Sequence, residues 1–374
     1  EFKYMKLFSI ETNIGFTQKP IDIPYDINFL VEMYHLGSLK KIYSIDKHNK
    51  DSCVFKIITS NGSYIARSVK SRNGYSDYRI LGDETMQELL ELQCSIINEI
   101  NFENIIKPIR NVDNHYTQKQ NDNVWMLYPY IKGELFDGQI HPGDIVIKAL
   151  ELNAKFDDLE RSNEFYINRE LFPALDYKPS EWKILVESLT GSNNEILIPQ
   201  KYLSCESHQL LRVNRDYLME VTLEIQNLDG INYAHLNHYD LQHANVLLDN
   251  NCQIVFLDIE DIYYANRKIA LSYTIFKLLR HVVYMRKKTL QEVLGQYLPD
   301  ILSILEKNKN IGLSSIKDVF LYGMYRLVGE LFSICDPFMS KRNGKYLYDL
   351  EKKIHHLFEY NLLFLNGAGI SIGK

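Results

Sequence analysis

The sequence predicts an α+β protein of two lobes, in which an antiparallel sheet with one helix precedes a larger, mainly helical part. Its 374 residues, 45% of them hydrophobic, are enough for two lobes rather than one. Up to about residue 130, runs rich in β-branched and aromatic residues alternate with turn residues. Beyond that point, hydrophobic residues recur at helical spacing. We therefore expect an N-terminal lobe over residues 1–130 and a C-terminal lobe over residues 131–374.

The N-terminal lobe is expected to contain five strands and one helix. The strands fall within residues 34–45, 54–70 and 105–133. In the second of these ranges, Asn61-Gly62 offers the positive φ angles that a tight hairpin turn needs, so two paired strands are expected there. Hydrophobic residues at helical spacing predict the helix, over residues 83–100.

The C-terminal lobe is expected to be mostly α-helical because five of its segments carry a helical hydrophobic period. These segments are residues 144–160, 179–189, 215–228, 270–285 and 318–335.

Composition and charge exclude several classes of function. The net charge of −6 and a pI near 6.0 give no basic footprint for nucleic acid, so nucleic acid is not an expected partner. The five cysteines are scattered and never occur as C-x-x-C, which argues against a disulfide framework or a structural zinc site. No apolar stretch is long enough to span a bilayer, and the N-terminus lacks a signal-peptide pattern. We expect a soluble cytoplasmic protein without a membrane partner.

The stretch HYDLQHANVLLDN, His238 to Asn250, carries the strongest functional signal. The residues after Asn245 read as a strand, a turn at residues 249–251 and a returning strand at residues 254–257. Such a hairpin brings Asp258 back beside Asn245, so that an amide oxygen and a carboxylate can share one hard cation. Mg²⁺ prefers oxygen ligands of this kind, with phosphate and water completing its shell.

Asp240 precedes Asn245 by five residues, close enough for its carboxylate to face the same cavity and to accept a proton from a substrate hydroxyl. The pattern H-x-D-x-x-x-x-N followed by a further Asp matches the template of phosphoryl transfer. There the first Asp orients or deprotonates the acceptor, while Asn and the later Asp hold metal on the nucleotide phosphates.

HYDLQHANVLLD followed by IVFLDIED resembles the catalytic segment of the aminoglycoside phosphotransferase and choline kinase family, and the resemblance extends more weakly over most of the chain. It implies a protein-kinase-like fold with Mg²⁺ as cofactor and ATP or GTP as phosphoryl donor. On that resemblance Asp240 is the catalytic base, His238 orients the loop, and Asn245 and Asp258 are the metal ligands.

The resemblance also implies a nucleotide site in the N-terminal lobe. Arg67 stands where the family has a strand cation, usually Lys, that contacts the phosphates, with Lys70 as an alternative on the opposite face. Arg keeps the charge but presents a planar fork, so the exchange is not neutral. Glu91 is the implied helix partner of that cation. Gly37-Ser38 offers a short phosphate-facing turn instead of a full G-x-G-x-x-G.

LYPYIKGE resembles the hinge between the two lobes. Tyr128 is then the gatekeeper, the carbonyl of Pro129 and the N–H of Ile131 bind the edge of the base, and Gly133 begins the second lobe.

Several departures from the pattern of the family narrow the range of expected substrates. The usual Gly and Pro of the catalytic segment are replaced by Tyr239 and His243, and no A-P-E element follows Asp258. A peptide substrate held on an activation loop is therefore not expected.

We expect a small-molecule kinase of the aminoglycoside phosphotransferase type whose partner is a hydroxyl acceptor. A cationic acceptor would suit Glu260, Asp261 and the acidic residues of KFDDLE, which could surround an amine. Choline, ethanolamine, homoserine or a sugar remain alternative acceptors. A nucleotide-binding pseudokinase remains the alternative outside the enzyme class, and the oligomeric state is not predicted.

Overall fold

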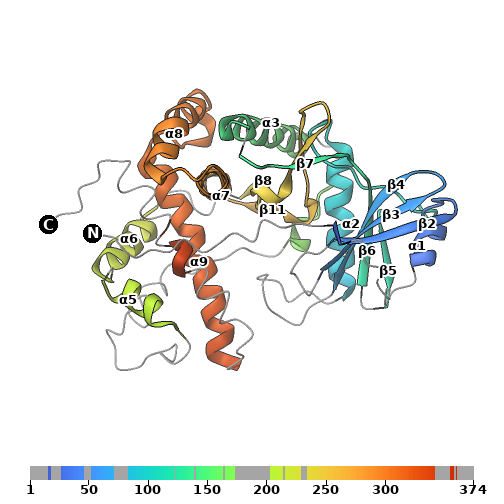
Figure 1. Cartoon of the computed structure of the whole chain (residues 1–374), viewed down its shortest axis with the longest axis horizontal. Helices are drawn as coiled ribbons and strands as arrows, with labels where there is room; N and C mark the ends of the chain where they lie inside the picture. The colour runs from blue at the N-terminus through green and yellow to red at the C-terminus, as the bar shows by residue number, and fades with distance from the viewer. Residues whose placement is uncertain are drawn as a thin grey trace.

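Figure 1 shows a β-sheet with two helices beside a larger helical part. The computed structural model describes residues 16–17, 27–45, 52–70, 83–121, 123–138, 140–162, 165–172, 203–213, 215–228, 234–341, 354–357 and 359. In these ranges no helix combines the length and hydropathy that a membrane crossing requires.

The sheet has six antiparallel strands in the order β1-β2-β3-β4-β6-β5. Their bounds in chain order are β1 Phe16–Thr17, β2 Leu39–Ile45, β3 Ser52–Thr59, β4 Ser63–Lys70, β5 Thr117–Gln120 and β6 Asn123–Pro129. Strand β6 is buried on both faces from Asn123 to Tyr128, and Trp125 of β6 and Ile57 of β3 are fully buried.

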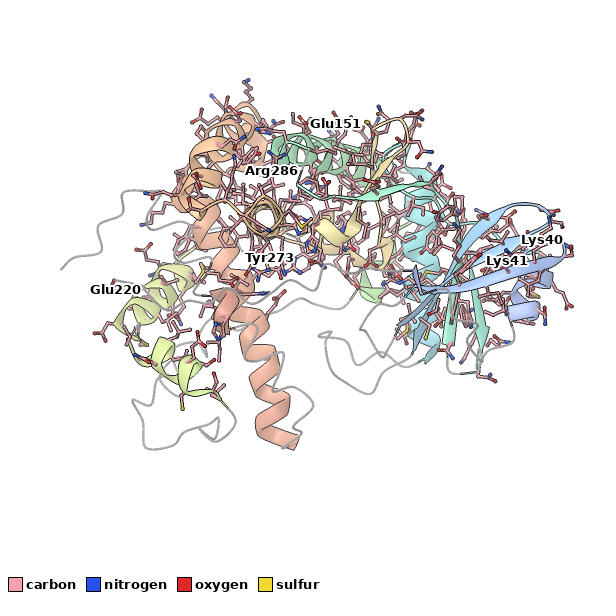
Figure 2. All side chains as sticks on the ribbon, viewed as in Figure 1. Lys40, Lys41, Glu151, Glu220, Tyr273 and Arg286 are labelled. Atoms are coloured by element: carbon pink, nitrogen blue, oxygen red, sulfur yellow. The ribbon has the colours of Figure 1, made fainter. Side chains whose placement is uncertain are left out.

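The expected hairpin is formed by β3 and β4, with Ile58 paired to Ser63. Its turn does not use a left-handed Asn61, whose side-chain amide donates to the carbonyl of His35 instead. Across the sheet, a bulge in β2 lets Lys40 and its neighbour Lys41 both project into solvent (Figure 2).

Two helices accompany the sheet. Helix α2, Asp83–Glu99, matches the predicted range and buries one face that includes Leu90 and Ile97. Helix α1, Ile27–Met33, was not predicted. This helix ends at Met33, and the chain then turns at Gly37, which adopts the left-handed region at φ 82°. Strand β2 therefore begins only at Leu39, later than the expected start at Tyr34.

The larger part is helical, as the sequence predicts. Its helices are α3 Pro142–Arg161, α5 Cys205–Val213, α6 Arg215–Gln226, α7 Arg267–Arg286, α8 Leu290–Lys307 and α9 Ile316–Lys341. Helices α5 and α8 were not expected, although α8 begins with a Thr289/Glu292 capping box that the sequence displays. The helix expected over residues 179–189 lies outside the described residues. Helix α7 crosses the interior and buries residues on all sides, among them Tyr273 (Figure 2).

Two small sheets connect the large sheet to the helices (Figure 1). One has the order β10-β9-β7, with β7 at Gly133–Leu135, β9 at Val246–Asp249 and β10 at Ile254–Phe256. The other pairs β8, His235–His238, with β11, Ile262–Ala265. The site described below is built on the loops between these short strands.

Gly133 is required by the close approach of β7 to β9, since an added Cβ would lie 2.0 Å from the backbone oxygen of Leu248. We expect Gly133→Ala to lower the free energy of unfolding by about 1–3 kcal/mol, because the two backbones would have to separate. Urea denaturation measures this change. Gly295→Ala is the matched control, since nothing lies within 4 Å of that added Cβ in helix α8. It should leave stability unchanged or raise it slightly, and equal losses in both variants would contradict the explanation.

Candidate active site

The hairpin expected from the sequence is present and joins the two segments that carry the motif. Strands β9 and β10 pair in register from Val246–Phe256 to Leu248–Ile254. At the open end of this ladder the N–H of Leu257 donates to the carbonyl of Asn245 at 2.8 Å. Asn245, one residue beyond the last pair, and Asp258, two residues beyond it, therefore lie on adjacent segments at this end of the hairpin.

Asp240 is held in one orientation by contacts to both carboxylate oxygens. Its Oδ2 accepts a hydrogen bond of 2.8 Å from Nε2 of Gln242, and its Oδ1 lies 3.4 Å from Nη2 of Arg326. The backbone carbonyl of Asp240 accepts from Nδ2 of Asn245 at 2.8 Å. These contacts fix the orientation of the carboxylate, while the side chain of Asp240 stays 21% exposed and can be reached by an acceptor.

His238 connects this loop to the segment that carries Asp258. Its Nε2 lies 2.8 Å from the carbonyl oxygen of Leu257, and since a carbonyl only accepts, Nε2 carries the proton. Burial lowers the pKa of His238 below its usual value, which favours the neutral ring. In this structure His238 ties strand β8 to the residue before Asp258, which is an orienting contact.

Asp258 adopts a left-handed conformation, with φ 63° and ψ 54°, immediately before the short helix η4, Ile259–Asp261. A non-glycine residue in this region is strained unless its surroundings hold it there, and such strain concentrates at functional sites. The turn directs the carboxylate into the cavity, where the Nη1 atom of Arg67 approaches its Oδ1 to 2.5 Å.

The oxygen atoms at this position fit a hard cation. Nδ2 of Asn245 donates to the carbonyl of Asp240. The other polar atom of this side-chain amide is Oδ1, an oxygen of the kind that Mg²⁺ prefers. The position beside Asp258 already favours positive charge, since it attracts the guanidinium of Arg67. Asn245 and Asp258 are the residues that would hold the metal.

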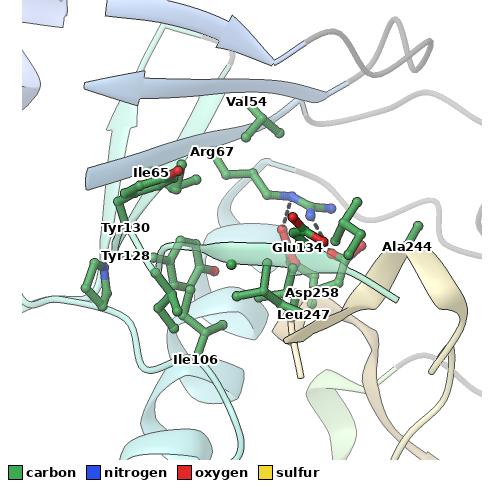
Figure 3. A pocket seen from close by; sticks show the side chains of 16 residues that line it. Val54, Ile65, Arg67, Ile106, Tyr128, Tyr130, Glu134, Ala244, Leu247 and Asp258 are labelled. Carbon is green, nitrogen blue, oxygen red and sulfur yellow. Dashed lines mark ion pairs between the residues drawn. The ribbon is translucent and has the colours of Figure 1, made fainter. Parts of the chain in front are cut away.

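Arg67 reaches the site from strand β4 but does not pair with Glu91, so the expected pair is wrong. Its guanidinium bridges Asp258 and Glu260, which approaches Nε closely (Figure 3). Burial and the adjacent Asp258 raise the pKa of the Glu260 carboxyl, and the contact with Arg67 opposes this rise. Glu91 faces away and accepts hydrogen bonds of 2.9 and 3.0 Å from the backbone N–H of Tyr116. It anchors helix α2 to strand β5.

A cavity of about 410 Å³ lies between the sheet and the β7-β9-β10 unit (Figure 3). Its apolar lining comes mainly from Val54, Ile65, Ile106, Ile131, Leu135, Leu247 and Leu257. Its charged end is formed by Arg67, Asp258 and Glu260. A cavity with an apolar section and one charged end suits a ligand with an apolar part and a charged part.

The segment from Tyr128 to Ile131 forms one wall of this cavity. Tyr128 is buried, its hydroxyl contacts Sδ of Met126 at 3.4 Å, and burial raises the pKa of that hydroxyl. Pro129 ends strand β6 and pairs with Tyr64, so the wall is continuous with the sheet. The structure therefore places all three expected hinge residues, Tyr128, Pro129 and Ile131, at the cavity.

Gly37 and Ser38 lie elsewhere, so the expected phosphate-facing turn is wrong. The N–H of Ser38 donates to Oγ of Ser60 at 3.0 Å, and a Cβ on Gly37 would collide with that oxygen. Neither residue lines the cavity. The turn at Ser60 lies next to Ser63, the first residue of β4, whose carbonyl accepts from the N–H of Tyr130. The loop between β2 and β3, residues 46–51, and the side chain of Lys70 lie outside the described residues.

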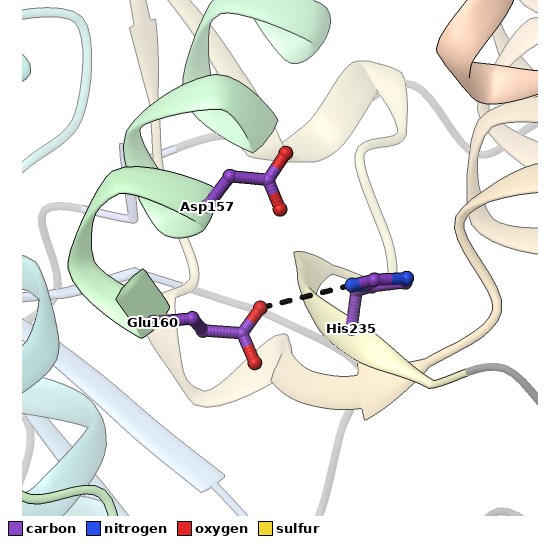
Figure 4. A group of neighbouring side chains, drawn as sticks. All are labelled: Asp157, Glu160 and His235. Carbon is purple, nitrogen blue, oxygen red and sulfur yellow. Dashed lines mark ion pairs between the residues drawn. The ribbon is translucent and has the colours of Figure 1, made fainter. Parts of the chain in front are cut away.

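The acidic residues of KFDDLE are engaged by arginines. Asp157 binds Nη1 of Arg267 at 2.7 Å, and Glu160 binds Nη2 of Arg169 at 3.2 Å. With His235 they form a compact group at the start of β8, the end of that strand away from Asp240 (Figure 4). These carboxylates are already paired with arginines, and the expected contact with an acceptor amine stays a prediction.

The expectations from the sequence missed two residues that hold the site. Gln93 of helix α2 donates through Nε2 to the carbonyls of Glu260 and Ile262, at 2.9 and 2.8 Å. A polar residue within the apolar face of that helix was the available signal. Arg326 contacts Asp240 from helix α9, and its signal was an Arg and a Glu one turn apart in an otherwise apolar helix.

His281 of helix α7 stacks on His243 of the loop, with ring centroids 3.9 Å apart, and burial lowers its pKa to about 4. Because the unfolded chain binds this proton near pH 6.5, stability that is present above pH 6.5 should be lost as the pH falls toward 4. We expect this loss to be on the order of 2 kcal/mol. Denaturation curves between pH 7.5 and 4 measure it, and His281→Phe should show a smaller dependence than wild type. The same dependence in both proteins would exclude His281 as the source.

Comparison with solved structures identifies the architecture. A spectinomycin phosphotransferase in complex with ADP and spectinomycin gives a TM-score of 0.56 at 12% sequence identity, over 90% of this chain and 94% of its own. An aminoglycoside phosphotransferase from Alicyclobacillus acidocaldarius gives 0.55 at 16% identity, over 92% and 95%. The chain has the aminoglycoside phosphotransferase fold.

The predicted fold class, α+β and protein-kinase-like, is thereby confirmed. No protein-family model matches the sequence, and no curated protein matches it either. At 12% and 16% identity this similarity shows the fold alone.

Proposed function

We propose that the protein is a small-molecule kinase, which transfers the γ-phosphoryl group of Mg-ATP or Mg-GTP to a hydroxyl group. One observation carries the proposal. Asp240 lies on the loop before the β9–β10 hairpin and is joined to Asn245 by a hydrogen bond, and Asn245 and Asp258 lie at the open end of that hairpin. Asp258 lines a cavity that Arg67 reaches from the large sheet. These are the groups that phosphoryl transfer needs, and they lie in a chain with the aminoglycoside phosphotransferase fold.

The cavity would bind the nucleotide with its base between the sheet and β9. Ile65 above and Leu247 below supply apolar surfaces for a flat ring, and the carbonyl of Pro129 and the N–H of Ile131 offer polar atoms at its edge. The phosphates would then point toward Arg67, whose planar fork suits phosphate oxygens. A volume of about 410 Å³ is in the range of small-molecule sites.

Asn245 and Asp258 would hold Mg²⁺, which supplies charge neutralisation on the phosphates when it is bound. Arg67 bridges Asp258 and Glu260 here, so its positive charge offsets the repulsion between these two neighbouring carboxylates. We propose that Arg67 turns toward the phosphates when nucleotide and metal enter, while Glu260 continues to hold its Nε.

Asp240 would act on the acceptor. Its carboxylate accepts the hydroxyl proton as the acceptor oxygen forms a bond to the γ-phosphorus, and the bond from that phosphorus to the bridging β–γ oxygen breaks. The products are a phosphate ester and a nucleoside diphosphate. Since Gln242 and Arg326 fix the carboxylate, the chain contributes orientation together with proton acceptance.

The experiment that tests this function measures nucleoside diphosphate release from Mg-ATP and Mg-GTP across aminoglycosides, amino alcohols, homoserine and sugars. Release that depends on both an acceptor and Mg²⁺ is the expected result, and the acceptor that supports it names the substrate class. Neutral and cationic acceptors of similar size should be compared, because the carboxylates of KFDDLE are already paired. Tight Mg-nucleotide binding without release from any acceptor would favour the pseudokinase instead.

A further inference from the structure

A buried arginine from the far end of the chain contacts the loop that carries Asp240. Arg326 lies on helix α9, 86 residues beyond Asp240, and is 6% exposed. Its Nη1 donates to the carbonyl of Tyr239, and its Nη2 lies 3.4 Å from Oδ1 of Asp240. The planar guanidinium of Arg326 therefore contacts the backbone of Tyr239 and the side chain of Asp240.

The guanidinium of Arg326 is itself held on every side. Its Nε donates to Oε1 of Glu330 at 3.1 Å, and Oε2 of the same carboxylate accepts from the hydroxyl of Tyr273 at 3.2 Å. The rings of Tyr273 and Tyr239 lie 3.7 and 4.0 Å from its central carbon, one from helix α7 and one from the loop. The two stacked rings and the hydrogen bond of Nε fix the plane of the guanidinium group. The ammonium group of a lysine is not planar and could not make the same set of contacts.

We propose that Arg326 is a positioning residue for phosphoryl transfer, which sets the orientation of the Asp240 carboxylate. The inference rests on the proposed function for its effect on turnover. Arg326 is buried, does not line the cavity, and uses Nε, Nη1 and Nη2 on protein acceptors. It therefore acts through Asp240 and not on the acceptor or the nucleotide.

The arrangement explains how a short loop can hold a reactive carboxylate. Gln242 fixes Oδ2 from within the loop, and Arg326 fixes Oδ1 from helix α9, so neither oxygen is free to rotate away. Helix α9 packs against α7, so the orientation of the base depends on the helical core. A displacement of about 1 Å in a reacting group can cost on the order of 100-fold in rate.

The test uses the full-length protein with Arg326→Met, which removes the fork, and Arg326→Lys, which keeps the charge alone. Arg280→Met is the matched control, because Arg280 is a buried arginine on α7 whose guanidinium binds Glu359 and the hydroxyl of Tyr284. Should Arg326→Met fail to fold, Arg326→Lys and Glu330→Gln carry the same measurements, since Glu330 fixes the plane of the fork.

The first readout is hydrogen exchange of residues 239–245 without nucleotide, which does not require turnover. We expect exchange to accelerate about 10-fold or more in both Arg326 variants and to stay unchanged in Arg280→Met. Unchanged exchange in the Arg326 variants would overturn the proposal. If wild type transfers no phosphoryl group, the proposed function fails, and this readout still decides whether Arg326 positions the loop.

The second readout is a double-mutant cycle with Asp240→Asn. Arg326→Met alone should lower kcat by about 10–100-fold with the nucleotide KM nearly unchanged. In the Asp240→Asn background the same change should cost less than about 3-fold, because the group through which Arg326 acts is already altered. Full additivity, or a loss expressed in KM alone, would overturn the proposal even though the kinase assignment stood. Arg280→Met should leave kcat unchanged in both backgrounds.

Discussion

Asp240→Asn is expected to lower kcat for acceptor phosphorylation by about 10²–10⁴-fold, because an amide cannot accept the hydroxyl proton. The substitution keeps the size of the side chain, and its Oδ1 can still accept from Gln242 or lie near Arg326. Nucleotide affinity should therefore stay close to that of wild type. Steady-state kinetics and a separate calorimetric measurement of Mg-nucleotide binding check both parts.

Asp249→Asn is the control, since it changes the same residue type on the hairpin that follows the Asp240 loop. Asp249 lies at the closed end, where its Oδ1 accepts from the N–H groups of Asn251 and Gln253 at 2.8 Å. An Asn can make these contacts, so full activity is expected. Equal losses in the two variants would mean that the hairpin as a whole, and not the Asp240 carboxylate, determines the rate.

Asp258→Ala should abolish the dependence of nucleotide binding on Mg²⁺ and lower kcat/KM by roughly 10²–10³-fold. The substitution removes the carboxylate that would hold the metal and leaves Arg67 paired with Glu260 alone. Calorimetric titration with ATP and GTP, in excess Mg²⁺ and in excess chelator, measures the expected change.

The chelator arm is the internal control for this prediction. Wild type and Asp258→Ala should bind metal-free nucleotide with similar affinity, because the apolar surfaces of Ile65 and Leu247 are intact in both. A variant that retains the full Mg²⁺ effect would contradict the assignment of Asp258 as a metal ligand.

The parts of the fold with strong local signals could be predicted from the sequence. Helix α2 and the hairpins β3–β4 and β9–β10 appear where the hydrophobic period and the turn residues placed them. Helix α1 was missed because seven residues give a weak period, and the strand expected from Tyr34 starts later because the chain first leaves that helix through Gly37. These errors arise at element ends, where tertiary contacts outweigh local preference.

The site was predictable where its residues are close in sequence. Asp240 lies on the loop directly before the β9–β10 hairpin, and Asn245 and Asp258 lie at the open end of that hairpin, so their spacing alone brings them together. The partner of Arg67 was not predictable in this way. Glu91 and Glu260 are both far from Arg67 along the chain, and the choice between them depends on which face of α2 packs against the sheet. The contact of Arg326 with Asp240 was not predictable for the same reason, because the two residues are far apart along the chain.

The most direct test of the kinase assignment follows the phosphoryl group itself. ATP and GTP labelled with ³²P at the γ position are incubated with the protein, Mg²⁺ and each acceptor class, and the label is separated as nucleotide, inorganic phosphate or phosphate ester. We predict that label enters a phosphate ester of one acceptor class with wild type and does not with Asp240→Asn. Label that remains in the nucleotide with every acceptor, or that appears only as inorganic phosphate, would contradict phosphoryl transfer to a hydroxyl.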